Sequence, residues 1–141
     1  MLKEKYKEIT LIISVISLLT IFLNAIDFNA YVKTYISGLS VVFGKDGYTF
    51  NVVLFVTWLL PILAVVAIYL LKGDLGFYLG IFIFLIASIL ELFTTQIFLS
   101  ANNLEAVGSL FNLGIGPTIR GILSFIGAIY LLSVKMLKNN N

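Results

Sequence analysis

The feature that most constrains this chain is a long apolar run over residues 76–99, which contains a single acid, Glu91. About 20 apolar residues are enough for a helix to cross a bilayer, and this run has about 24. At about 100° per residue, its small and polar residues fall on one face of a helix. That face carries Gly76, Gly80, Ala87, Glu91, Thr94 and Thr95. Because a carboxylate is costly in hydrocarbon, we expect this face to point into a helix bundle.

Composition extends this interpretation to the whole chain. Of the 141 residues, 60% are hydrophobic and 11% are charged, whereas the apolar share of soluble domains is about 45–50%. The charges lie mostly between four apolar runs, at residues 9–26, 51–71, 76–99 and 117–134. We therefore predict an all-α membrane protein, a bundle of four transmembrane helices that forms a single domain over residues 1–141.

Three local features refine the spans. A basic segment precedes residues 9–26, as in a signal peptide, but the apolar part is long, so we interpret it as a retained span. Pro61 lies inside the second run and predicts a kink that serves packing. The connection Lys72-Gly73-Asp74 is so short that the second and third helices must be antiparallel neighbours.

The first long loop, residues 27–50, has β-forming character. The stretches 39–43 and 48–50 favour strands, and Gly44-Lys45-Asp46-Gly47 between them is a turn signal. We predict a short β-hairpin around Lys45-Asp46-Gly47.

Small residues predict which helices pack closely. Lipid offers no hydrophobic driving force between helices, so close approach at small side chains takes its place. We expect the third and fourth helices to pack through Gly76, Gly80 and Ala87 on one side and Gly121, Ser124 and Ala128 on the other.

Basic residues predict the orientation. With both termini on one side, that side carries six Lys residues, and the other side carries Lys33, Lys45 and Arg120. Excess positive charge marks the cytoplasmic side. We therefore predict a multi-pass protein of the cell membrane with both termini in the cytoplasm. The six residues are Lys3, Lys5, Lys7, Lys72, Lys135 and Lys138.

Glu91 has three interpretations. It forms a structural ion pair or hydrogen bonds in the bundle, it is an ion or proton site, or it contacts a basic residue of a partner subunit. Side chains lean toward the N-terminus of their helix. Glu91 and Arg120 should therefore lean in opposite directions, which makes their pairing difficult. The candidate buried polar site comprises Glu91, Arg120, Asn24, Thr94 and Thr95.

Composition also argues against several functions. The chain has no Cys and no His, which removes the thiolate nucleophile and the commonest general base and metal ligand. We find no catalytic, metal, cofactor or nucleotide motif, and a net charge of +2 is too small for nucleic-acid binding. A membrane aspartic peptidase needs two facing aspartates, but Asp27 and Asp74 should lie on opposite sides of the membrane. We expect a protein that is not an enzyme and has no cofactor.

Two patches carry a resemblance. Residues 36–44 and the segment Leu113-Gly114-Ile115-Gly116-Pro117 resemble segments of small uncharacterised bacterial four-span membrane proteins. Some members carry an N-terminal zinc ribbon, which a chain without Cys lacks. The order of spans and a β-rich first outer loop is similar to the layout of claudin-like proteins, without their Trp and Cys signature. This resemblance implies a four-span fold but carries no activity.

Two functional classes follow. The first is a non-enzymatic scaffold, accessory or interaction subunit of a membrane complex, with a protein partner or a second copy of itself in the bilayer. The alternative is a small oligomeric channel or transporter in which Glu91 is an ion or proton site. A closed environment around Glu91 favours the first class, and a wet cavity favours the second.

Overall fold

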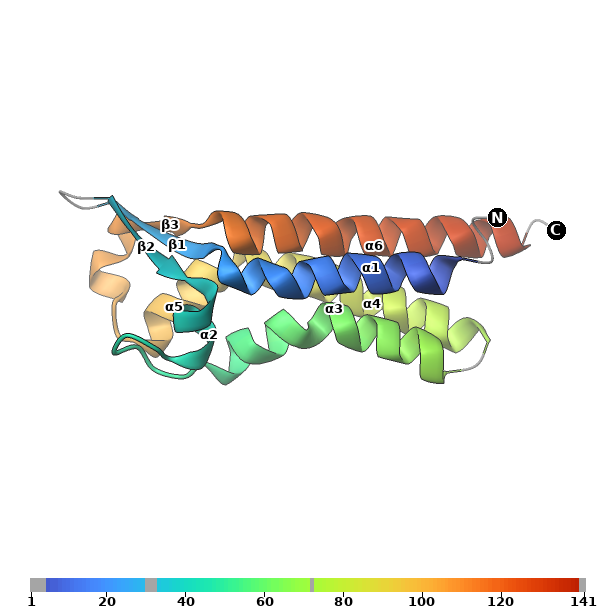
Figure 1. The fold of residues 1–141 in the computed structure, drawn as a ribbon, viewed down its shortest axis with the longest axis horizontal. Helices are drawn as coiled ribbons and strands as arrows, with labels where there is room; N and C mark the ends of the chain where they lie inside the picture. The colour runs from blue at the N-terminus through green and yellow to red at the C-terminus, as the bar shows by residue number, and fades with distance from the viewer. Residues whose placement is uncertain (1–4, 30–32, 72, 140–141) are drawn as a thin grey trace.

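The computed structural model describes residues 5–29, 33–71 and 73–139. Its long helices lie side by side along the long axis, and both termini lie at the same end (Figure 1). Within the described residues, three helices are long and apolar enough to cross a membrane: α3 (Val52–Leu70), α4 (Asp74–Leu92) and α6 (Ile115–Asn139). These helices indicate a membrane protein. The structure differs from the predicted spans mainly in the first and third runs.

The first apolar run forms a shorter helix than predicted. Helix α1 (Tyr6–Leu19) continues as a 3-10 turn, η1 (Thr20–Phe22), and the chain is extended from Leu23 onward. The predicted boundary at residue 26 is therefore wrong. Asn24 and Asp27 are weak helix formers, and the backbone here pairs with strands instead.

Helix α1 packs on α3 through its polar side. The side chains of Thr10, Ser14 and Ser17 are fully buried. The Ser14 hydroxyl donates a hydrogen bond to the carbonyl of Pro61, at 2.7 Å. Helix α3 continues from Val52 to Leu70 with Pro61 inside it. The proline therefore lies in a packed contact between two helices.

A three-stranded antiparallel sheet covers the end opposite the termini. It consists of β1 (Asn24–Asn29), β2 (Lys33–Ser37) and β3 (Phe111–Leu113), in the order β2-β1-β3. Ile26 pairs with Ile36 on one side and with Leu113 on the other. Because β3 lies in the second long loop, residues 100–116, the sheet joins the two loops.

The antiparallel strand pair predicted for the first long loop is formed by β1 and β2, so the predicted position around Lys45-Asp46-Gly47 is wrong. Residues Gly38–Phe43 form a short helix, α2. The Ser37 hydroxyl accepts a hydrogen bond from the Ser40 amide, and Gly44 ends the helix in the left-handed conformation. These caps, together with the burial of Val41 and Val42 in the core, outweigh the β preference of the segment. A turn does occur at Lys45, whose carbonyl accepts a hydrogen bond from the Tyr48 amide.

The third apolar run contains two helices rather than one. Helix α4 ends at Leu92, and α5 (Thr94–Ala101) begins after Phe93, whose backbone (φ −97°, ψ 7°) is not helical. The predicted span over residues 76–99 therefore ends at this break. Helix α5 leads to the 3-10 segment η2 (Glu105–Leu110) and then to β3.

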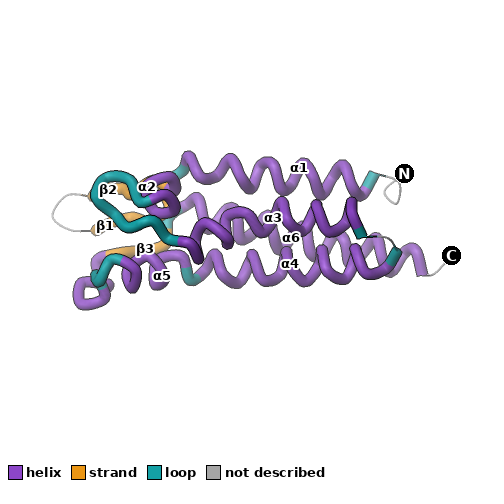
Figure 2. Tube along the Cα trace, turned by 90° about the horizontal axis from the view of Figure 1, so that it is seen from below, coloured by secondary structure: helices purple, strands orange, loops and turns teal. Residues whose placement is uncertain are grey.

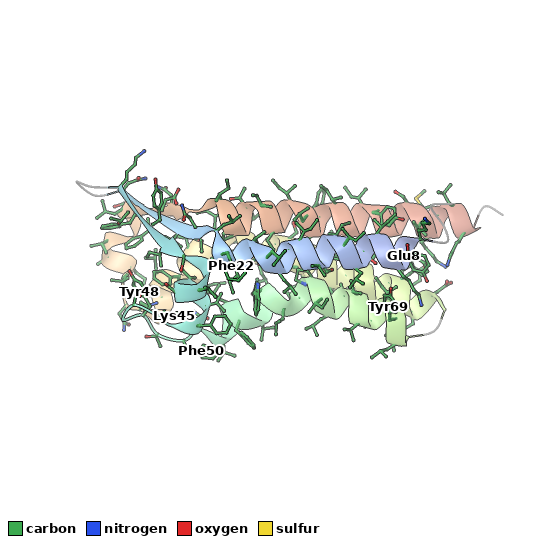
Figure 3. The ribbon with its side chains drawn as sticks, in the orientation of Figure 1. Glu8, Phe22, Lys45, Tyr48, Phe50 and Tyr69 are labelled. Carbon is green, nitrogen blue, oxygen red and sulfur yellow. The ribbon has the colours of Figure 1, made fainter. Side chains whose placement is uncertain are left out.

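The strands and α2 lie at one end of the long helices (Figure 2), and two apolar cores lie along the molecule. The cap core packs the sheet against α2, α5 and the beginning of α3, and includes Ile26, Val41, Leu54 and Phe98. The bundle core lies toward the termini and includes Val65, Phe84 and Leu131. Apolar side chains also cover the outside of the helices (Figure 3), as a lipid environment requires.

Helices α4 and α6 pack against each other, but small residues of α4 also contact α3. A Cβ atom on Gly76 would lie 2.8 Å from the carbonyl oxygen of Leu71, the residue that follows α3. A Cβ atom on Gly80 would meet Ile68 of α3 at 2.8 Å and Leu131 of α6 at 3.3 Å. Gly76 and Gly80 therefore bring α4 close to α3, and Gly80 also brings it close to α6. Ala87, Gly121, Ser124 and Ala128 are buried, and a Cβ atom on Gly121 would lie 3.4 Å from the Cβ atom of Glu91.

We predict that Gly76→Leu destabilises the fold more than Gly80→Leu does. The new side chain at Gly76 meets backbone, which cannot move aside, whereas at Gly80 it meets the ends of flexible side chains. Overpacking of this kind costs about 1–3 kcal/mol or more. Thermal unfolding in detergent measures the order. Ser133→Leu, at an exposed position of α6, is the control and should melt like the wild type. Equal melting temperatures for all three variants would contradict the packing.

Candidate functional site

Two charged side chains meet where the long helices join the end of the molecule that carries the sheet and α2. We call that end the cap. Glu91 lies in the last turn of α4, next to the break at Phe93, and Arg120 lies in the second turn of α6. Pro117, with its fixed φ, stands in the first turn of α6, where a missing amide donor is tolerated. The two helices are neighbours along much of their length, so these turns face each other.

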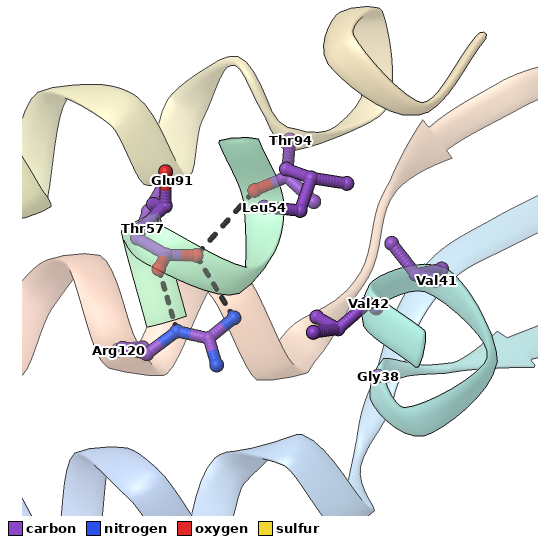
Figure 4. A pocket seen from close by; sticks show the side chains of 9 residues that line it. Gly38, Val41, Val42, Leu54, Thr57, Glu91, Thr94 and Arg120 are labelled. Carbon is purple, nitrogen blue, oxygen red and sulfur yellow. Dashed lines mark hydrogen bonds and ion pairs between the residues drawn. The ribbon is translucent and has the colours of Figure 1, made fainter. Parts of the chain in front are cut away.

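The pair is bidentate and buried. Arg120 donates from Nε to Glu91 Oε1 at 2.6 Å and from Nη2 to Glu91 Oε2 at 3.0 Å. The Thr94 hydroxyl donates to Glu91 Oε2 at 3.4 Å. Relative exposure is 1% for Glu91 and 4% for Arg120. We expected the two side chains to lean in opposite directions along their helices. The Arg120 side chain is long enough to reach the carboxylate of Glu91 all the same (Figure 4).

A small cavity lies between the ion pair and α2 (Figure 4). Its volume is about 10 Å³, which is close to the minimum of about 10–15 Å³ that holds one water molecule. Arg120 Nη1 is buried and has no hydrogen-bond partner among the described residues. The cavity is thus polar on one side and has room for about one water. Its lining comprises Ala25, Gly38, Val41, Val42, Leu54, Thr57, Glu91, Thr94 and Arg120.

The pair belongs to a polar layer between the two cores. Along α3, buried Thr57 lies between Leu54 of the cap core and Ala64 of the bundle core. Along the other helices, Glu91 follows Phe84, and Arg120 and Ser124 precede Ala128. We call Thr57, Glu91, Thr94, Arg120 and Ser124 the polar layer. Apolar side chains close it on both sides.

The other predicted site residues lie outside the ion pair. Asn24 lies in β1, where its backbone pairs with Ser37, and among the described residues its side chain makes no hydrogen bond to Glu91. Thr95 is buried, and its hydroxyl has no partner in the described part of the chain. Thr57 and the cap residues Gly38, Val41 and Val42 were missed by the sequence reasoning. No local signal marks them, because α2 reaches the site only through tertiary packing.

The arrangement can fix two helices in one register. In a low-dielectric interior each charge alone is strongly unfavourable, and attraction within the pair offsets the loss of water only when the geometry is good. Two parallel hydrogen bonds between Arg and carboxylate provide that geometry. Sliding or rotating α6 against α4 would separate the charges, so the pair selects one arrangement.

Comparisons with known proteins do not extend this picture. No protein-family model, curated protein or solved structure matches the chain. Within the described residues, no group of three or more Asp or Glu side chains gathers in a way that could hold a metal ion. The three long apolar helices indicate the broad class of helical membrane proteins.

We predict that the charges of Glu91 and Arg120 are energetically coupled. Glu91→Leu or Arg120→Leu alone should cost about 3–5 kcal/mol, since each leaves one buried charge without its partner. The double variant should recover a large part of that loss. Thermal unfolding of the three variants in detergent measures the coupling. Ser124→Ala, in the same polar layer, removes a hydroxyl that has no hydrogen-bond partner among the described residues and should change stability little. Additive losses in the double variant would contradict the coupling.

Proposed function

We propose that this chain is a four-span, non-enzymatic membrane protein that acts as a scaffold, accessory or interaction subunit of a membrane complex. The observation that carries the proposal is the closed polar layer. The carboxylate of Glu91 is engaged by Arg120 and Thr94 within the chain. The buried polar groups are thus used to hold the fold, and contacts with other molecules are left to the outer surfaces.

The outer side of α1 supports a fourth span. With η1, the helix runs from Tyr6 to Phe22, a length of about 27 Å at roughly 1.5 Å per α-helical and 2.0 Å per 3-10 residue. A hydrocarbon core is about 30 Å thick. The outer side of α1 is apolar and exposed, as on the other long helices, at Leu11, Ile12, Val15, Ile16, Leu19 and Phe22.

The charge distribution supports cytoplasmic termini in a bacterial cell membrane. Arg120 was counted among the outer basic residues, but it is buried in an ion pair. Lys135, on the side of the termini, is likewise buried in an ion pair. Without both residues, the sequence places five Lys residues on the side of the termini, against Lys33 and Lys45 on the other side. Lys3 and Lys72, two of these five, lie outside the described residues. The excess of positive charge that the positive-inside rule uses is therefore retained.

The alternative function, an oligomeric channel or transporter with Glu91 as an ion or proton site, receives less support. The cavity next to Glu91 has a volume of only about 10 Å³. Toward the termini, the polar layer is followed by the bundle core, with Phe84 and Leu131 fully buried. A path for ions would require both the ion pair and this core to open.

The sheet offers a surface for a protein partner. Strands β2 and β3 lie at its two edges, and edge strands present backbone groups that a further strand can pair with. Lys33, Thr34 and Tyr35 of β2 are exposed, and Tyr35 has 60% of its surface accessible. We expect a partner protein or a second copy of the chain to bind at the β2 edge.

We predict that a green fluorescent protein fused after Asn141 fluoresces in bacterial cells and that alkaline phosphatase fused there is inactive. This result follows from cytoplasmic termini, because the first reporter folds inside the cell and the second outside. Insertion of the same reporters at Gly47, in the turn at the sheet end, is the control and should give the opposite pattern. Phosphatase activity at Asn141 would contradict the orientation.

We predict that a photoreactive residue at Tyr35 crosslinks to a discrete protein partner or to a second copy in intact membranes. The same residue at Tyr78, 57% exposed on the other end of the molecule, is the matched control and should not give that product. Purification in mild detergent and mass spectrometry identify the product. If the residue at Tyr35 gives lipid adducts and no protein product, the interaction role is contradicted. A pH-dependent flux in liposomes that Glu91→Gln abolishes without unfolding would favour the transporter instead.

A further inference from the structure

A groove between α1 and α3 opens on the outer side of the bundle. Its volume is about 360 Å³, and it is lined by Leu11, Ile62, Val65, Val66, Tyr69 and Leu70. The lining is apolar except for the Tyr69 hydroxyl, so the groove suits a hydrocarbon chain better than a polar ligand.

A cation lies at the end of this groove nearest the termini. Lys7 precedes Leu11 by one helical turn, on the same side of α1. Its ammonium group lies over the ring of Tyr69, at 4.8 Å from the ring centroid, and Tyr69 is at the terminal end of the molecule (Figure 3). A positive charge over an aromatic face is held in place electrostatically. The groove therefore has an apolar floor and a positioned cation at one end.

The described residues provide no ion-pair partner for Lys7. Among the described residues the ion pairs join Glu91 to Arg120 and Asp74 to Lys135, and neither involves Lys7. Glu8 follows Lys7 directly and so points about 100° away around the helix. Lys138 adds a second cation at this end of the molecule, over the rings of Tyr6 and Phe77. Lys7 and Lys138 thus give this end of the molecule two positive charges that complement an anionic group.

We propose that the groove between α1 and α3 binds an anionic glycerophospholipid, with one acyl chain along the groove and the headgroup phosphate on Lys7. From Ile62 to Tyr69 the groove extends about 10 Å along α3, which is roughly two thirds of one hydrocarbon leaflet of about 15 Å. The inference depends on the proposed embedding in a bilayer. It depends neither on which side the termini face nor on a protein partner.

The headgroup contact is tested with lipids that differ only in charge. Purified full-length protein in mild detergent is titrated with phosphatidylglycerol or phosphatidylcholine of identical acyl chains, and native mass spectrometry measures the retained lipid. We expect preferential retention of phosphatidylglycerol. One Lys near an anionic lipid contributes enough that Lys7→Gln should weaken this binding about fivefold. Lys45→Gln, the same change at the sheet end, should leave it unchanged.

The groove is tested separately from the charge. Val66→Trp, at a groove position that is 42% exposed, should fill the groove and reduce phosphatidylglycerol retention while Lys7 stays in place. Val56→Trp, 45% exposed on α3 and outside the groove lining, is the control. Equal retention of the two lipids would overturn the proposal, as would wild-type retention in both Lys7→Gln and Val66→Trp. Neither result would affect the crosslinking and fusion experiments, so failure here is distinct from failure of the proposed function.

Discussion

The ion pair between Glu91 and Arg120 is the interaction on which the rest of the structure depends. Both side chains are almost fully buried, and neither charge is tolerated there without the other. The pair joins the end of α4 to the beginning of α6, at the level where the bundle core gives way to the cap core. It therefore fixes the register of these two helices, and with it the place where the cap must close over them.

The cap is attached at this level by close backbone contacts. A Cβ atom on Gly38 would lie 2.5 Å from the Ile21 carbonyl, and one on Gly114 would lie 2.5 Å from the Asn24 carbonyl. Only glycine permits such approaches. The first contact holds α2 against η1, which follows α1. The second holds the residue before α6 against the beginning of β1. The cap thus closes directly over the small cavity next to Arg120.

This arrangement separates the interior from the surfaces available for function. The interior is used to hold the fold: hydroxyls on α1 bond to backbone carbonyls, and the charged pair is closed. The outside offers two surfaces of different chemistry. The β2 edge at one end suits a protein strand, and the groove below Lys7 at the other end suits an anionic lipid. Under the two proposals, a protein partner and an anionic lipid would bind at opposite ends of the same bundle.

The sequence by itself determined the helical membrane character and the inward direction of Glu91. Both follow from local properties, namely apolar length and the cost of a charge in hydrocarbon. The number of spans and the direction of the termini stay predictions. Only the tertiary structure decided where α1 ends, where the sheet forms, that α4 breaks at Phe93, and that Gly76 packs on α3. The end of α1 and the sheet depend on pairing between β1 and β3, which are distant in sequence, and α2 depends on caps and burial that outweigh the β preference of residues 39–43. Local pattern cannot report such contacts, because the partners that stabilise them lie in other parts of the chain.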